Sequence, residues 1–208
     1  MRTSIRLTGL AALIAATVSC GDVVRQGSAP VFLVIDQLTG IRGGLSGATP
    51  SSTLISDVIT NVITPAPCSS DNPCPTIFGD TGSVVLRAPL KDPGATASLS
   101  PTTNNEVTIN RVHVAYSRAD GRKTPGVDVP FDFDQAVTGT IPAGGNLTIG
   151  FELVRNVAKQ ESPLVQLKTS SNIISMIATL TFYGADRVGN AIQTTGQITI
   201  EFGNFGDQ

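Results

Sequence analysis

The stretch Ile173–Phe202, IISMIATLTFYGADRVGNAIQTTGQITIEF, decides the fold that this sequence predicts. Its first half alternates between two faces with a period of two, which is typical of a strand that buries one face. The polar segment Ala185–Asn190 then reverses the chain, and the alternation resumes after it. The stretch therefore predicts an antiparallel hairpin. The side chains expected to face the core are Ile174, Met176, Ala178, Leu180, Phe182, Ile198, Ile200 and Phe202.

Short runs of strand-forming residues recur through the rest of the chain, with polar turns between them. They cover residues 30–38, 79–90, 106–118, 127–134 and 147–154. Charged residues make up only 14% of the chain, and the long Glu/Lys/Ala blocks of helical proteins are absent. About eight closely spaced strands with little helix predict an all-β, antiparallel sandwich of two sheets.

The terminal hairpin carries a resemblance to a known family. It turns through Asp-x-x-Gly-Asn at Asp186–Asn190, and Tyr183–Phe202 resembles the last two strands of bacterial immunoglobulin-like domains. The resemblance implies an immunoglobulin-like arrangement of the sandwich. It implies no activity.

The segment Leu54–Ile63, LISDVITNVI, can be interpreted in two ways. Its apolar residues recur at i and i+4, which fits a helix. It is also rich in β-branched residues and ends at a Thr-Pro pair, which fits a strand. We favour the strand, and the helix stays open as the alternative.

Two of the predicted strands have features of their own. In residues 106–118 the inward phase changes between Ile109 and Val112, which predicts a β-bulge near Asn110. In residues 127–134 the alternation predicts an edge strand, since Pro130 cannot donate a backbone hydrogen bond. Its expected inward side chains are Val127, Val129, Phe131 and Phe133, and its expected outward side chains are Asp128, Asp132 and Asp134.

The amino-terminal 22 residues, MRTSIRLTGLAALIAATVSCGD, have the order of an export signal. Arg2 and Arg6 give a basic start, and the apolar run Leu7–Val18 is shorter than the roughly 20 residues of a membrane-spanning helix. Small residues then lead to Cys20. The pattern predicts export.

This segment also resembles a bacterial lipoprotein signal, with Thr17 in the place where Leu is usual. The resemblance implies cleavage before Cys20 and a lipid on Cys20, so that the membrane is a partner. Because Asp does not directly follow Cys20, it implies the outer membrane if the host is Gram-negative. Plain secretion and a retained anchor are the alternatives.

The predicted organisation has three parts. Residues 1–19 are a signal peptide, residues 20–29 are a lipidated tether, and residues 30–208 form one β-sandwich domain. Within that domain we expect a long loop region around residues 39–80 that carries a disulfide. Once Cys20 is assigned to lipid, Cys68 and Cys74 remain as an even pair in an exported chain, separated by a short polar loop. We expect them to form this disulfide.

Calcium is the metal that the sequence could hold, since several hard oxygen ligands occur close together. The first candidate group is Asp128, Asp132 and Asp134 on the predicted edge strand, and the second is Asp186 with Asn190 in the last turn. The other interpretation of the three aspartates is a charged edge that discourages pairing with other molecules. No other cofactor is expected.

The composition argues against several classes of function. The formal net charge is −2 and no basic cluster occurs, so no nucleic-acid partner is expected. The single histidine, His113, lies within a predicted strand, and no nucleophile, base and acid can be assembled around it, so we predict that the protein is not an enzyme. The chain has no Trp and two Tyr, which disfavours aromatic sugar platforms.

The function predicted from the sequence is therefore a non-catalytic binding or structural role at the cell envelope. The expected partner is an envelope protein or a polysaccharide, in addition to the membrane. The alternative is a calcium- or glycan-dependent binding module that uses the edge strand bearing the aspartates.

Overall fold

The computed structural model describes residues 28–91 and 100–206. The strands are β1 (Val34–Ile41), β2 (Thr53–Asp57), β3 (Thr60–Val62), β4 (Cys74–Thr76), β5 (Asp80–Arg87), β6 (Val107–Arg118), β7 (Phe133–Ile141), β8 (Asn146–Val154), β9 (Ile174–Asp186) and β10 (Ala191–Gly203). Three short 3-10 helices complete the described elements: η1 (Thr103–Asn105), η2 (Ala158–Gln160) and η3 (Leu164–Thr169). The prediction of an all-β fold is confirmed.

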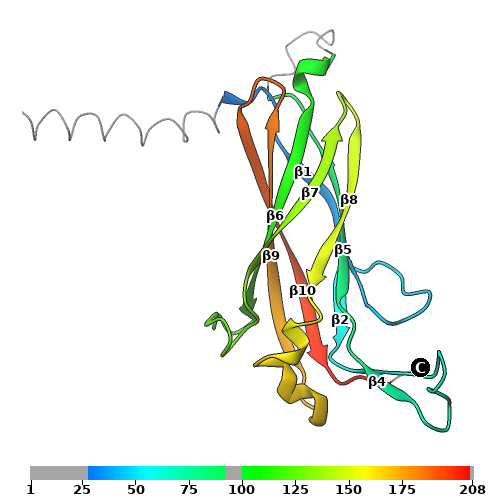
Figure 1. Ribbon diagram of the computed structural model, residues 1–208. Coiled ribbons are helices and arrows are strands. Elements are labelled where there is room, and N and C mark those ends of the chain that lie inside the picture. Colours follow the sequence, from blue (N-terminus) through cyan, green and yellow to red (C-terminus); the bar gives the residue numbers. More distant parts are fainter. Residues whose placement is uncertain (1–27, 92–99, 207–208) are drawn as a thin grey trace, which may run out of the picture.

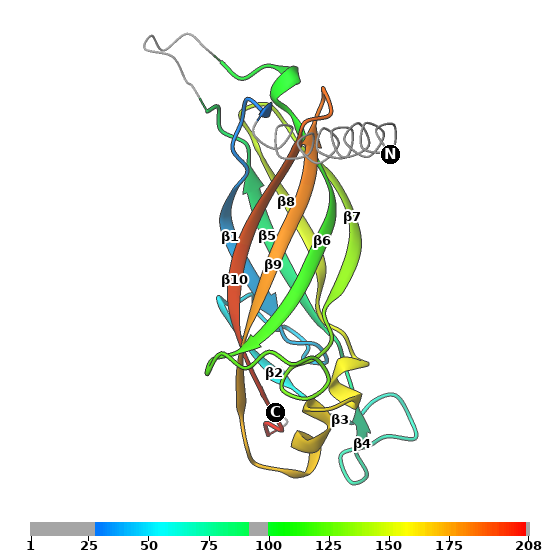
Figure 2. The ribbon, with the colours of Figure 1, turned by 90° about the vertical axis from the view of Figure 1, so that its left-hand side faces the viewer.

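Two sheets face each other along the length of the molecule (Figures 1 and 2). One has the order β1-β5-β8, and the other has the order β2-β10-β9-β6-β7. Together they provide the predicted sandwich of about eight strands. A third, two-stranded sheet pairs β3 with β4.

The sandwich differs from the prediction in one pairing. β2 runs parallel to β10, from Thr53 opposite Thr199 to Asp57 opposite Gly203. The loop after β1 turns the chain back, and Gly40 and Ser51 exchange two backbone hydrogen bonds of 2.8 and 3.0 Å. The chain then enters the second sheet beside β10 in the same direction. The sheets are therefore antiparallel except at this edge.

The hairpin β9–β10 forms as predicted, in continuous register from Ile174 opposite Phe202 to Ala185 opposite Ala191. The predicted inward side chains of the two strands are buried, apart from Ile174, which is half-buried. The bulge in β6 is also confirmed, because its register shifts between Ile109 and Arg111 against both neighbouring strands. This extra residue lets both halves of β6 turn apolar side chains inward.

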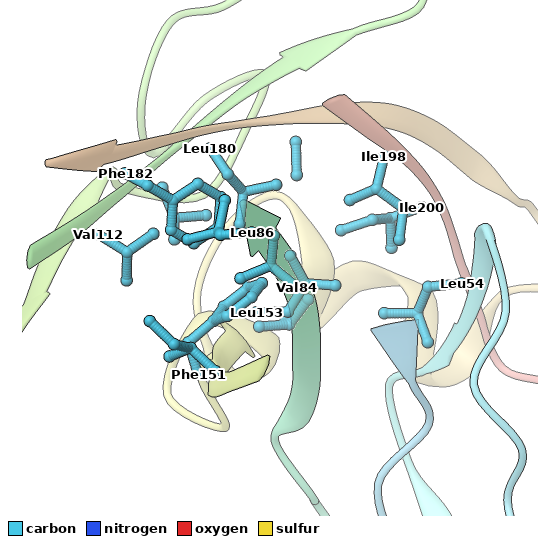
Figure 3. Close-up of a cluster of buried hydrophobic side chains, with 14 of the residues drawn as sticks. Leu54, Val84, Leu86, Val112, Phe151, Leu153, Leu180, Phe182, Ile198 and Ile200 are labelled. Carbon is cyan, nitrogen blue, oxygen red and sulfur yellow. The ribbon is translucent and has the colours of Figure 1, made fainter. Parts of the chain in front are cut away.

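The interior is filled from both sheets (Figure 3). Val84 and Leu86 from β5 and Leu153 from β8 are fully buried. From the opposite sheet, Phe182 meets Phe151 edge to face, with ring centroids 5.6 Å apart and an interplanar angle of 72°. Aromatic pairs in this geometry add about 0.5 to 1.5 kcal/mol beyond the area that they bury.

The predicted edge strand over residues 127–134 is wrong. The carbonyl of Thr124 accepts hydrogen bonds from the N–H groups of Val127, Asp128 and Val129, and Gly126 has a φ of +74°. These residues therefore form a turn, which leaves Val127 66% exposed and Phe131 52% exposed. The strand starts only at Phe133 as β7, which does lie at the edge of its sheet.

Other boundaries also differ from the prediction. Leu54–Ile63 is extended, as favoured, but it forms the two strands β2 and β3 with a break at Val58–Ile59. The expected loop region around residues 39–80 contains β2, β3 and β4. The first strand begins at Val34 instead of residue 30. Within the described ranges, no helix is both long and apolar enough to cross a membrane.

Candidate functional site

Four charged side chains meet at one end of the sandwich, and we call them the ionic cluster: Arg42, Asp57, Asp80 and Lys159. Three of these four residues lie at or next to the end of a strand. Arg42 directly follows β1, Asp57 is the last residue of β2, and Asp80 is the first residue of β5. Lys159 comes from η2, which folds over this end (Figure 2). The cluster therefore joins four segments that lie far apart in the sequence.

Lys159 and Asp80 form the centre of the cluster. The ammonium Nζ of Lys159 lies 2.8 Å from Oδ2 of Asp80, and the two side chains are 1% and 0% exposed. Nζ also donates a hydrogen bond of 2.8 Å to the backbone carbonyl of Asp57. The hydroxyl of Ser56 donates to the same Oδ2 at 2.6 Å. Both charged groups are thus removed from water and held by several partners.

The second pair of the cluster lies nearer the surface. A guanidinium nitrogen of Arg42 lies 2.5 Å from Oδ2 of Asp57. The other oxygen of Asp57 accepts the backbone N–H groups of Phe205 and Ile59, at 3.2 and 3.4 Å. Asp57 therefore ties the loop after β1 to the end of β10.

Gly43 is required where the backbone approaches the cluster. Its N–H donates to Oδ1 of Asp80 at 2.8 Å. A Cβ at this position would lie 2.0 Å from the carbonyl oxygen of Gly79, which no side chain can occupy. Only glycine lets this N–H reach the carboxylate.

Burial lowers the pKa of Lys159 below its usual range, because the ammonium loses its hydration. The nearby Asp80 carboxylate acts in the opposite direction and favours the charged form. A lysine with a lowered pKa is a better nucleophile, yet its amine has no access to an external substrate, since it is 1% exposed. Its available reaction partner is the adjacent carboxyl group.

Arg42 connects the cluster to a surface hollow of about 290 Å³. Its side chain is 18% exposed, and its buried Nε has no hydrogen-bond partner among the residues that the structure describes. Besides Arg42, the hollow is lined by Gly44, Leu45, Ser46, Thr60, Asn61, Val62, Ile63 and Thr64. A polar ligand at this surface would meet one cation and several hydroxyl groups.

The predicted disulfide is present, with the Cα atoms of Cys68 and Cys74 5.4 Å apart. It closes the loop between β3 and β4 at the same end of the sandwich (Figure 1). Cys20, the predicted lipid site, lies outside the residues that the structure describes.

Replacing both cysteines of the disulfide with serine is expected to lower the free energy of unfolding by about 2 kcal/mol, because a short closed loop restricts the unfolded chain. Urea denaturation of the double variant and the wild type measures this. Reduction of the wild type should give a similar loss. A change in the free energy of unfolding below about 0.5 kcal/mol would contradict a stabilising role of the disulfide, because an ordinary surface substitution changes stability by as much.

The three aspartates predicted on one strand face do not converge. Asp128 accepts the N–H of Thr124 at 3.3 Å, and Asp132 accepts the N–H of Tyr116 at 3.3 Å. Asp134 instead pairs with Arg111, at 3.0 Å. It also contacts the ring of His113, at 3.3 Å.

The second calcium candidate forms the hairpin turn. Asp186 is 5% exposed, and its Oδ1 accepts the N–H groups of Val188 and Asn190 at 3.1 and 2.8 Å. Its Oδ2 accepts the side-chain amide of Asn190 at 2.7 Å. This arrangement is an Asx turn that fixes the β9–β10 reversal. Among the described residues, no group of three His, Cys, Asp or Glu could hold a metal ion. Calcium binding stays a prediction.

The ionic cluster was not predicted from the sequence. Lys159 lies in a polar segment where an exposed lysine is the usual expectation. The one available signal was Asp57, a charged residue within the apolar segment Leu54–Ile63. It indicates a buried charge without identifying the partner.

The fold and the site define an all-β sandwich protein with a closed ionic cluster at one end. No protein-family model matches the chain, and a search of curated proteins finds no significant match.

Proposed function

We propose that this protein is an exported, lipid-anchored β-sandwich of the bacterial cell envelope, with a non-catalytic binding or structural role. The observation that carries the proposal is the Cys68–Cys74 disulfide, because disulfides form and persist in oxidising compartments outside the cytoplasm. The signal-like start of the chain and Cys20 support the same location.

The ionic cluster supports a structural role over a catalytic one. Lys159 and Asp80 are closed off from solvent, and Ser56 is committed to the Asp80 carboxylate. A catalytic group must contact its substrate in a plausible pose, and none of these three side chains can do so while buried. The surface next to Arg42 is where an envelope protein or polysaccharide could bind.

Replacing Cys20 with alanine is expected to move the protein from the membrane fraction to the soluble fraction, because the lipid is the anchor. Mass spectrometry of the mature amino terminus checks this, and the wild type should show a diacylated or triacylated Cys20. Anchoring by one or more acyl chains follows from the burial of their CH₂ groups, each contributing about 0.8 kcal/mol.

The variant in which Cys68 and Cys74 are both serine is the control. It should remain in the membrane fraction, since it keeps Cys20 and changes only stability. An unmodified amino terminus in the soluble fraction of wild-type cells would contradict the lipid anchor. Membrane retention of the Cys20→Ala variant with an intact amino terminus would point instead to an uncleaved anchor.

A further inference from the structure

We propose that Lys159 and Asp80 become joined by an intramolecular isopeptide bond, which forms when the side-chain amine condenses with the side-chain carboxyl group. The two groups already touch, with Nζ 2.8 Å from Oδ2. Both side chains are essentially excluded from solvent, at 1% and 0% exposure. The proposal is independent of where the protein resides.

The condensation is balanced without any further reactant. A bond forms between Nζ of Lys159 and Cγ of Asp80, and the bond between Cγ and Oδ2 breaks. Two of the three ammonium protons leave with Oδ2 as one water molecule, and the third stays on the amide nitrogen. No electron is gained or lost.

Proximity favours the bond-forming step. Holding an amine and a carboxyl group in contact makes their reaction unimolecular, and effective molarities of roughly 10⁵ M or more are known for well-oriented groups. The carbonyl of Asp57 accepts a hydrogen bond from Nζ, and so helps to hold the amine beside the carboxyl group. The fold thereby supplies the orientation that this reaction requires.

Burial favours the neutral amine that must attack. Loss of hydration lowers the pKa of Lys159, and a proton passed to the adjacent carboxylate gives an uncharged amine and carboxylic acid. Such a transfer removes two charges from a site where each is costly.

Two donors are placed to stabilise the charge that develops on the carboxyl oxygens. The N–H of Gly43 donates to Oδ1 at 2.8 Å, and the hydroxyl of Ser56 donates to Oδ2 at 2.6 Å. A donor aimed at the developing oxyanion lowers the barrier to acyl transfer. Ser56 can also pass a proton to Oδ2 as this oxygen leaves. Once the amide has formed, exclusion of bulk water disfavours its hydrolysis.

Peptide mass spectrometry of the full chain tests the proposal. After reduction, trypsin should release the peptide 43–87 joined to the peptide 156–168, at the sum of their masses less one water. Cleavage after Lys159 should be lost, because its side chain is then an amide. Fragmentation should place the branch at Asp80 and Lys159.

The matched control is Lys159→Arg, which keeps a positive charge but removes the nucleophilic amine. Its digest should contain peptide 43–87 as a separate species at its sequence mass. The wild-type digest decides the matter even if that variant does not fold. Free peptides 43–87 and 156–159 from folded wild-type protein, with no branched species, would overturn the proposal.

Discussion

Replacing Asp80 with alanine should lower the free energy of unfolding by about 3 to 5 kcal/mol relative to the ion-paired protein without the cross-link, the usual cost of removing one partner from a buried ion pair. Loss of the isopeptide cross-link adds to this difference when the wild type carries the bond. Within the described part of the chain, the variant leaves the buried Lys159 ammonium with the Asp57 carbonyl as its hydrogen-bond acceptor, and it removes the acceptor of the Ser56 hydroxyl. It also deprives the Gly43 N–H of its partner. Urea denaturation at neutral pH, followed by circular dichroism, measures the loss.

The double variant Asp80→Ala with Lys159→Met tests whether the unpaired charge of Lys159 causes this loss of stability. It removes the buried charge along with its partner, and apolar replacement of a whole buried pair is often close to neutral. Neither variant can form the isopeptide bond, so their difference isolates the cost of the unpaired lysine. We expect the double variant to be more stable than Asp80→Ala. Equal stability of the two variants would contradict this account.

Phe182→Ala should destabilise the protein by about 3 to 5 kcal/mol, because a fully buried ring is lost from the middle of the sandwich and a cavity remains. The edge-to-face contact with Phe151 is lost at the same time (Figure 3). The same denaturation experiment applies. The slope of the free energy of unfolding against urea concentration should stay unchanged, because the surface area exposed on unfolding remains similar.

Phe131→Ala is the matched control for this prediction. Phe131 is 52% exposed in the irregular segment between the Gly126 turn and β7, so the same substitution should change stability by no more than about 0.5 kcal/mol. A similar loss at both positions would contradict the assignment of the core.

Sequence periodicity predicted those elements in which the apolar positions of the sequence are also the buried positions of the structure. The β9–β10 hairpin and the bulge between Ile109 and Arg111 are two such elements, because one buried face fixes the register of the strands. Residues 127–134 show the limit of the method. They alternate as a strand does, but the turn at Gly126 and the irregular residues after it replace most of the expected strand, and the side chains of Val127 and Phe131 are exposed. Nor does a local pattern reveal the parallel pairing of β2 with β10.

The candidate site was less predictable than the fold. The disulfide could be predicted because its two cysteines are close in sequence, and so could the turn at Asp186. The ionic cluster could not, because the partners of Asp80 and Lys159 are brought together only by the packing of β1, β2, β5 and η2. Charged residues are usually exposed, so their burial is a property of the folded arrangement.

The points at which the described chain enters and leaves the sandwich have a mechanical consequence. The chain that leads into β1 enters at one end of the sandwich, and the chain after β10 leaves at the other (Figures 1 and 2). A force applied between the chain before β1 and the chain after β10 would pull these two strands along their own axes. The backbone hydrogen bonds between neighbouring strands lie perpendicular to this force and would be loaded in shear. Many of them would have to break at the same time, so we expect the fold to resist unfolding by stretching.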